Sequence, residues 1–171
     1  GALVAPRRVK LSALMHGGGQ ERLLRPGTPS PALATAFTEA LVEAHQTRAA
    51  FTAHSLTLRT QLLRDIGSLS NIKVNEGKQQ APHICNISLI GRDTDYLVAL
   101  LDEAGFAVST RSACETDEEG SRAVLVMTND PERACSTLRV SWGPETSQKD
   151  IAAFSRALIA SVKFLDTAGI L

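Results

Sequence analysis

The chain has 171 residues, 43% of them hydrophobic and 21% charged, and its 18 basic side chains balance its 18 acidic ones. These values are typical of a soluble globular chain with one domain, or one domain and an appendage. The even charge argues against nucleic-acid binding, which needs a concentrated positive face. No apolar stretch approaches the ~20 residues of a membrane-spanning helix. The chain starts without methionine inside a short apolar run, which is typical of a piece of a larger protein.

The cysteines indicate a reducing compartment. Cys85, Cys114 and Cys135 are an odd number in a chain too long to depend on disulfides, and no CxxC motif occurs. The four histidines do not lie at zinc-site spacing from any cysteine. The sequence therefore predicts a cytoplasmic protein without a metal centre, in which a catalytic thiol is possible.

The N-terminal third predicts a strand, a loop and a long helix. Residues 2–5 are apolar and precede a proline, which favours a strand. Residues 16–28 contain three consecutive glycines and are expected to form a loop. Residues 32–66 contain neither Gly nor Pro, so they predict a helix about 52 Å long that bends near residues 52–57 or connects two domains. Capping residues flank this helix: Ser30, Pro31 and Gly67.

From residue 71 onward the pattern predicts a small α+β sandwich. One strand should place Cys85, Ile87 and Leu89 on a single buried face. The last helix should begin at Ser147 with Asp150 completing a capping box, and its apolar face should be buried. The expected strands are 71–75, 84–90, 106–108 and 137–142, and the expected helices are 94–104, 122–127 and the C-terminal one.

Three segments resemble, in order and at near-family spacing, the cysteine desulfurases. These are pyridoxal-phosphate (PLP) enzymes of the class V aminotransferase group, and the selenocysteine lyases share the first segment. Residues 16–28 read HGGGQERLLRPGT and resemble the glycine-rich loop, residues 109–114 read STRSAC and resemble the catalytic-cysteine loop, and residues 136–143 read STLRVSWG and resemble the substrate-arginine strand. The resemblance covers essentially the whole chain.

The resemblance implies the small α+β domain of a fold type I PLP-dependent aminotransferase, with a long connecting helix and the last strand of the large domain. Residues 1–30 would then be a remnant of the large PLP domain, 31–67 the connecting helix and 68–171 the small domain. The implied activity removes sulfur from L-cysteine through PLP, giving alanine and a persulfide for a sulfur acceptor protein in iron–sulfur cluster assembly or tRNA thiolation. A homodimer is implied as well.

The resemblance also implies roles for three residues. Cys114 would be the nucleophile that takes the sulfur; a buried, inert thiol is the alternative, but the acidic run that follows it favours exposure. Arg139 would bind the substrate carboxylate, although a solvent-facing strand arginine is the default for a single Arg. Thr28 would contact the PLP phosphate of the partner subunit, or would simply end the loop as a turn residue.

One departure from the family concerns the cofactor. A PLP enzyme needs a lysine for its Schiff base, and none of the five lysines here lies in the family's Ser/His-Lys setting. The chain alone is therefore expected to be inactive. The alternatives are a selenocysteine lyase, another class V PLP enzyme, and a truncated non-catalytic module that only folds or dimerises.

Overall fold

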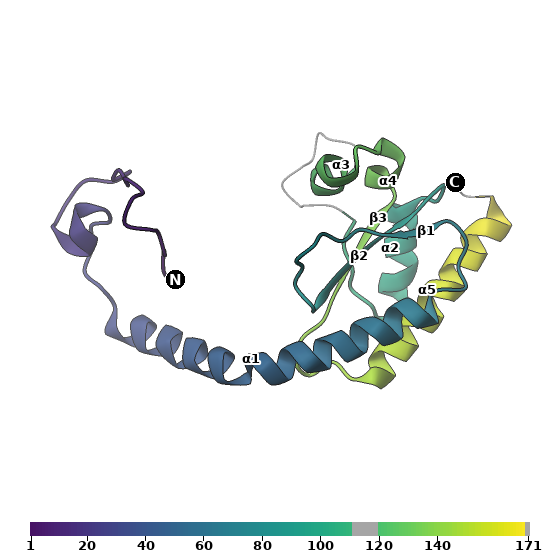
Figure 1. Ribbon diagram of the computed structural model, residues 1–171, viewed down its shortest axis with the longest axis horizontal. Helices are drawn as coiled ribbons and strands as arrows, with labels where there is room; N and C mark the ends of the chain where they lie inside the picture. The colour runs from purple at the N-terminus through teal and green to yellow at the C-terminus, as the bar shows by residue number, and fades with distance from the viewer. Residues whose placement is uncertain (111–119, 170–171) are drawn as a thin grey trace. The chain divides into compact units, whose positions relative to one another are not determined.

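The computed structural model describes residues 1–110 and 120–169, so Cys114 lies outside the described residues. The chain divides into two compact units, Gly1–Ala49 and Ala50–Leu171. The elements follow one another as η1, α1, β1, β2, α2, α3, α4, β3 and α5 (Figure 1).

In the N-terminal unit nearly all side chains are exposed. The expected strand at residues 2–5 is wrong: these residues belong to no strand, and their side chains are exposed. A strand is stable only when its backbone groups pair with a neighbour, and no described strand pairs with this segment. The glycine-rich segment forms a loop, as predicted, that includes the 3₁₀ turn η1 (Gln20–Leu23).

The long helix is confirmed as α1 (Pro31–Asp65). The Ser30 hydroxyl caps the start of this helix by accepting a hydrogen bond from the N–H of Leu33 at 3.4 Å. Proline occupies the first helical position, where its missing N–H costs no helical hydrogen bond. Side chains of α1 become buried only from Ser55 onward, within the C-terminal unit.

The C-terminal unit contains a three-stranded antiparallel sheet in the order β1 (Ile72–Val74), β2 (Ile84–Leu89), β3 (Thr137–Ser141). The register pairs Cys85 with Val140 and Asn86 with Arg139. Because side chains alternate along a strand, the inner face carries Cys85, Val140 and their apolar neighbours, as predicted, and the outer face carries Asn86 and Arg139.

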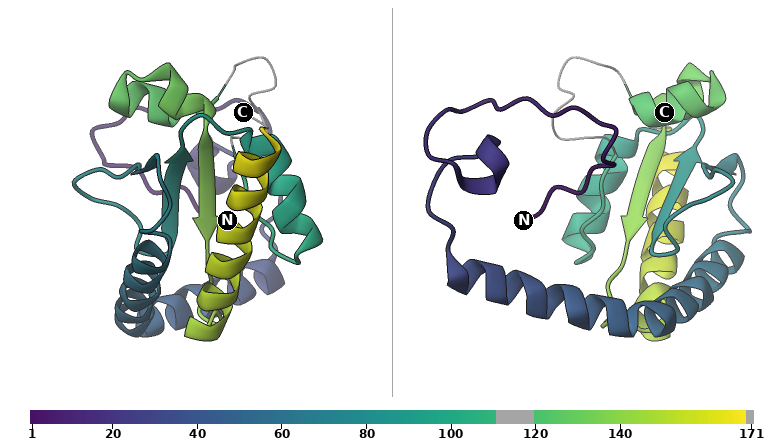
Figure 2. Two further views of the ribbon diagram at one scale, coloured as in Figure 1. Left: turned by 90° about the vertical axis from the view of Figure 1, so that its right-hand side faces the viewer. Right: turned by 60° about the vertical axis from the view of Figure 1, so that its left-hand side comes forward.

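The core lies on the inner face of this sheet. It joins α2 (Thr94–Glu103), α5 (Gln148–Ala168) and the buried end of α1 to the strands. Both views of Figure 2 place α2 and α5 on the same side of the sheet. The predicted capping box at Ser147 and Asp150 is present, and the predicted apolar face of α5 is buried: Ile151, Phe154, Leu158, Val162 and Leu165.

Two short helices, α3 (Arg122–Thr128) and α4 (Pro131–Cys135), lead into β3. The first was expected and the second was not. The expected strand at 106–108 is wrong, because only its neighbour Ser109 forms a single antiparallel bridge, to Arg139. Phe106 and Val108 instead pack against the core. Within the described residues no helix is long and apolar enough to cross a membrane.

Candidate active site

Arg139 lies in the middle of β3 and is exposed, whereas its neighbours Leu138 and Val140 are buried. Its side chain therefore stands on the outer face of the sheet, opposite the core. Within the described part of the chain the guanidinium has no hydrogen-bond or ion-pair partner. A guanidinium carries forked donors that can pair with a planar anion such as a carboxylate through two parallel hydrogen bonds.

The residues that precede the cysteine segment are bonded to the same strand. Ser109 and Arg139 exchange two backbone hydrogen bonds, of 2.6 Å from the Arg139 N–H and 3.3 Å from the Ser109 N–H. The Thr137 hydroxyl donates to the carbonyl of Thr110 at 2.6 Å. The Thr110 hydroxyl in turn donates to Asp95 on α2 at 3.1 Å. The chain therefore enters residues 111–119 from a fixed position beside Arg139.

The residues that follow the segment are bonded just before β3. The N–H of Ser121 donates to the carbonyl of Ala134 at 2.9 Å. Gly120 has φ +91°, and a Cβ there would lie 2.8 Å from the backbone of Ala134, so only glycine fits this approach. Both flanks of residues 111–119 are thus attached to one stretch, Ala134–Arg139.

The other two cysteines have different surroundings. Cys85 is fully buried, and burial is the main cause that raises the pKa of its thiol, with Arg59 acting in the opposite direction. A thiol held neutral in the core is a poor nucleophile, and the predicted burial of Cys85 is confirmed. Cys135 ends α4 and is exposed.

Thr28 lies in the N-terminal unit, where it is exposed and follows Gly27 at φ +116°. The loop before it folds back on itself. A Cβ on Gly17 would lie 2.7 Å from the Cβ of Pro26, and the Gln20 side chain accepts from the N–H of Gly27 at 3.3 Å. The structure does not relate Thr28 to Arg139, because the two residues belong to different units.

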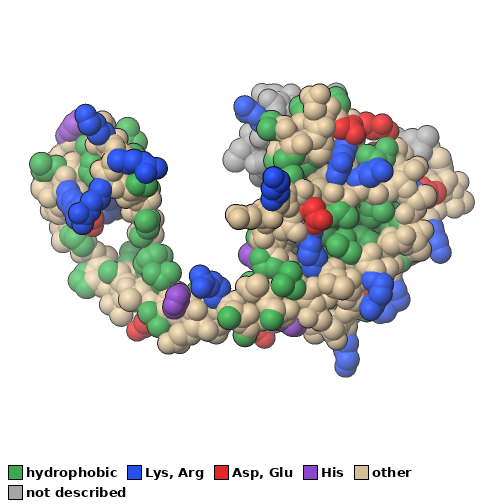
Figure 3. All heavy atoms as spheres, in the orientation of Figure 1, with side chains coloured by type: hydrophobic (Ala, Val, Ile, Leu, Met, Phe, Trp, Pro, Cys, Tyr) green, Lys and Arg blue, Asp and Glu red, His purple; other side chains and the backbone are tan. Residues whose placement is uncertain are grey.

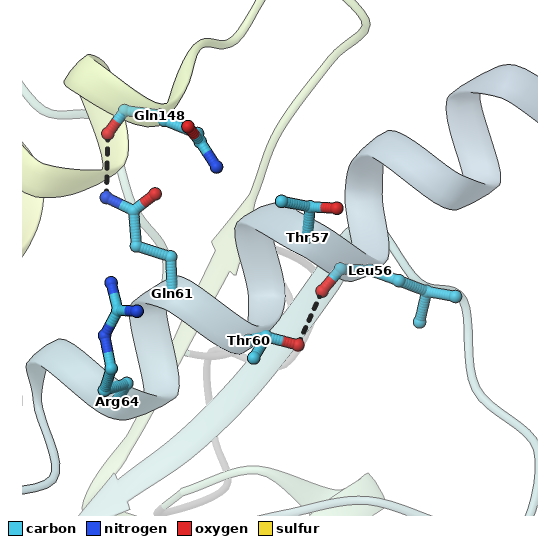
Figure 4. A pocket seen from close by; sticks show the side chains of 6 residues that line it. All are labelled: Leu56, Thr57, Thr60, Gln61, Arg64 and Gln148. Atoms are coloured by element: carbon cyan, nitrogen blue, oxygen red, sulfur yellow. Dashed lines mark hydrogen bonds between the residues drawn. The ribbon is translucent and has the colours of Figure 1, made fainter.

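All five lysines are exposed, and none lines the cavity beside α1 and α5 or the one beside Leu41, Val42, His45 and Gln46. The cavity beside α1 and α5, of about 350 Å³, contains Arg64 as its only charged residue, together with Thr, Gln and Leu side chains (Figure 4). The described residues also hold no cluster of three or more His, Cys, Asp or Glu that could bind a metal.

The sequence pattern of the class-V aminotransferases matches residues 8–154, which is most of the chain. The chain belongs to the class-V aminotransferase family. Two similar members of this family are proteins named cysteine desulfurase IscS. The one from Neisseria gonorrhoeae is 34% identical over 165 residues, which are 94% of this chain and 40% of that protein. The one from Psychromonas ingrahamii is 36% identical over 156 residues, or 88% of this chain and 38% of that protein.

A solved structure confirms the class-V fold. A NifS-like protein from Rickettsia africae has a TM-score of 0.77 at 20% identity, covering 91% of this chain and 41% of the other. The chain therefore spans about two fifths of the length of the class-V aminotransferases that it matches. The predicted fold class, with the exception of the strand at residues 2–5, agrees with this likeness.

Proposed function

We propose that this chain is the part of a PLP-dependent cysteine desulfurase that carries the sulfur-accepting thiol and the carboxylate-binding arginine. One observation supports this most: residues on both sides of the Cys114 segment are hydrogen-bonded to the stretch Ala134–Arg139. Cys114 follows Thr110 by four residues, and four residues span at most about 14 Å. A thiol whose flanking residues are bonded to the same stretch as an arginine suits a substrate that carries both sulfur and a carboxylate.

In this proposal Arg139 binds the carboxylate of L-cysteine through two parallel charge-assisted hydrogen bonds. The Cys114 thiolate attacks the substrate sulfur and forms an S–S bond while the C–S bond breaks. The electron pair of the C–S bond leaves with the carbon, which takes a proton and becomes the methyl group of alanine. The sulfur stays on Cys114 as a persulfide and then passes to an acceptor protein, as in iron–sulfur cluster assembly or tRNA thiolation.

PLP supplies the electron sink for such a reaction when it is bound. Because no lysine of this chain lies in a suitable setting, we propose that the lysine lies elsewhere and that the chain alone is inactive. We further propose a cytoplasmic homodimer, in which Thr28 reaches the phosphate of the cofactor in the partner subunit. In the same proposal, residues 1–30 are a remnant of the PLP domain, 31–67 connect the two domains, and 68–171 form the small domain.

The desulfurase is favoured over a selenocysteine lyase because the relatives described above are named cysteine desulfurases. The test compares this chain alone with a PLP-loaded protein that contains it, both supplied with L-cysteine and a thiol reductant. We expect alanine and sulfide only from the loaded protein. A borohydride-fixable chromophore on this chain alone, or no alanine from the loaded protein, contradicts the proposal.

A further inference from the structure

We propose that Arg133 is a positioning residue for sulfur transfer. Its side chain fastens the short helix α4 to the outer face of the sheet, and α4 leads into the stretch to which both flanks of the Cys114 segment are bonded. The inference rests on the proposed function for the roles of Cys114 and Arg139. It adds a residue that the sequence patterns did not point to.

The helix α4 is short and mostly exposed. It has five residues, too few for a stable isolated helix, and of these only Ala134 is buried. The Arg133 side chain crosses from α4 to the end of β1. Its Nε donates to Oδ1 of Asn75 at 2.5 Å, and its Nη2 donates to the carbonyl of Val74 at 2.7 Å. Hydrogen bonds from a charged donor are among the stronger ones in proteins.

The receiving side of this contact is a closed polar network. Asn75 is 8% exposed, and its Nδ2 donates to Oδ1 of Asn86 at 2.7 Å and to the hydroxyl of Ser88 at 2.8 Å. The Ser88 hydroxyl donates to the carbonyl of Arg133 itself at 2.7 Å. Removing one member of such a network leaves buried groups without partners, so the network holds one geometry.

This network adjoins both parts of the candidate site. Asn86 is the register partner of Arg139, so the network ends on the strand position beside the carboxylate-binding candidate. At the other end, Ala134 follows Arg133 directly and accepts the N–H of Ser121, at the exit from the cysteine segment. Loosening Arg133 should therefore affect the exit from the segment and the neighbour of Arg139 together.

The chain offers a matched control in Arg92. This arginine is 8% exposed, and it donates to the two carboxylate oxygens of Asp166 at 2.7 and 3.0 Å and to the carbonyl of Ser70 at 3.0 Å. None of these partners belongs to the stretch Ala134–Arg139. Arg133 is half-buried, so Arg92→Met removes a more deeply buried arginine that makes similar hydrogen bonds at another place, and it separates lost stability from lost positioning.

The first readout is amide hydrogen exchange in this chain. Arg133→Met should speed exchange of the Ser121 N–H about tenfold or more relative to Arg92→Met at matched unfolding midpoints. Arg133→Lys should recover part of the protection, since an ammonium can still donate to one of the two oxygens. Equal exchange at Ser121 in the two methionine variants overturns the proposal.

The second readout is turnover of the PLP-loaded protein that contains this chain. We expect Arg133→Met to lower kcat about tenfold relative to the protein without substitutions, and Arg133→Lys to lower it less. In Arg92→Met, kcat should stay near that of the protein without substitutions. Unchanged kcat in Arg133→Met, with no turnover in Cys114→Ala, overturns the role of Arg133 and leaves the proposed function standing. Full turnover in Cys114→Ala overturns both.

Discussion

At the scale of single residues, the outward orientation of Arg139 follows from the alternation of side chains along β3. Leu138 and Val140 turn into the core, so the alternation of the strand turns Arg139 outward, and Asn86 lies beside it. An arginine on the core face would have needed a buried partner for its charge. On the outer face its charge needs no buried partner, and within the described residues no side chain pairs with its guanidinium.

Replacing Arg139 tests this role. In the loaded protein Arg139→Ala should weaken the apparent affinity for L-cysteine by about 30- to 1000-fold, because a lost bidentate pair costs about 2–4 kcal/mol. Arg139→Lys should restore only part of it, since an ammonium lacks the fork. Steady-state kinetics measures the change. Unchanged affinity in Arg139→Ala would return this residue to the class of solvent-facing strand arginines.

The two cysteines that the structure describes differ in how far their positions could be predicted from the sequence. The buried position of Cys85 followed from strand alternation, because Ile87 and Leu89 share its face. The exposure of Cys135 did not, because it depends on α4, a helix that starts at a proline and was not expected. Proline is well tolerated at the first position of a helix, which is where Pro131 stands in α4. Asp130 caps this helix, because its side chain accepts a hydrogen bond from the N–H of Arg133 at 3.0 Å.

At the scale of elements, most of the helices and strands were predictable because their signals are local. The helix α1 followed from an uninterrupted run with a capping residue at its start, and α5 from its apolar period and capping box. The network of Asn75, Asn86, Ser88 and Arg133 was not predictable, because it joins residues up to 58 positions apart in the chain. Its existence depends on how β1, β2 and α4 meet.

The two ends of α5 give the fold a defined acid sensitivity. Hydrogen bonds from the backbone and hydroxyl of Ser147 lower the pKa of Asp150, and the hydrogen bond from Arg92 lowers the pKa of Asp166. A lowered pKa in the folded state means that the unfolded state binds protons first. The stabilisation is therefore complete well above the ordinary value of 3.8 and is lost as pH falls below 3.8 through the lower folded value.

Asp150→Asn combined with Asp166→Asn should reduce this dependence. We expect the double variant to be less stable than the unchanged chain at pH 7, and the difference between the two to shrink as the pH is lowered below 3.8. Urea unfolding followed by circular dichroism from pH 7 to the acid limit measures it. Two stability curves that stay parallel over this range would show that neither carboxylate contributes in the manner described.

At the scale of the whole molecule, the two units differ in how much apolar surface they bury. The C-terminal unit has a contiguous core that joins the sheet to α2, α5 and the end of α1. The N-terminal unit has no buried side chain, and hydrophobic side chains lie open along the first half of α1 (Figure 3). The larger ones on that half are Leu33, Phe37, Leu41 and Val42. In the proposed homodimer of the longer protein, apolar groups of this extent would be covered.

Limited proteolysis should reveal this difference. We expect cleavage first within residues 1–30 and resistant products that retain α2, β3 and α5, because the described core residues all lie in the C-terminal unit and none lies within residues 1–30. Mass spectrometry of a time course identifies the products. Early cleavage inside α2 or α5, with the N-terminal segment intact, would contradict the assignment of stability to the C-terminal unit.

The central claim is that Cys114 takes sulfur from L-cysteine, and locating the transferred sulfur tests it most directly. The PLP-loaded protein is incubated with L-cysteine labelled in its sulfur, alkylated without reductant, digested and analysed by mass spectrometry. We predict the labelled persulfide on the peptide that contains Cys114, no labelled persulfide on Cys85, and no alanine formation in Cys114→Ala although cofactor absorbance is kept. Labelled sulfur on Cys135 alone, or alanine formation that persists in Cys114→Ala, would contradict the account.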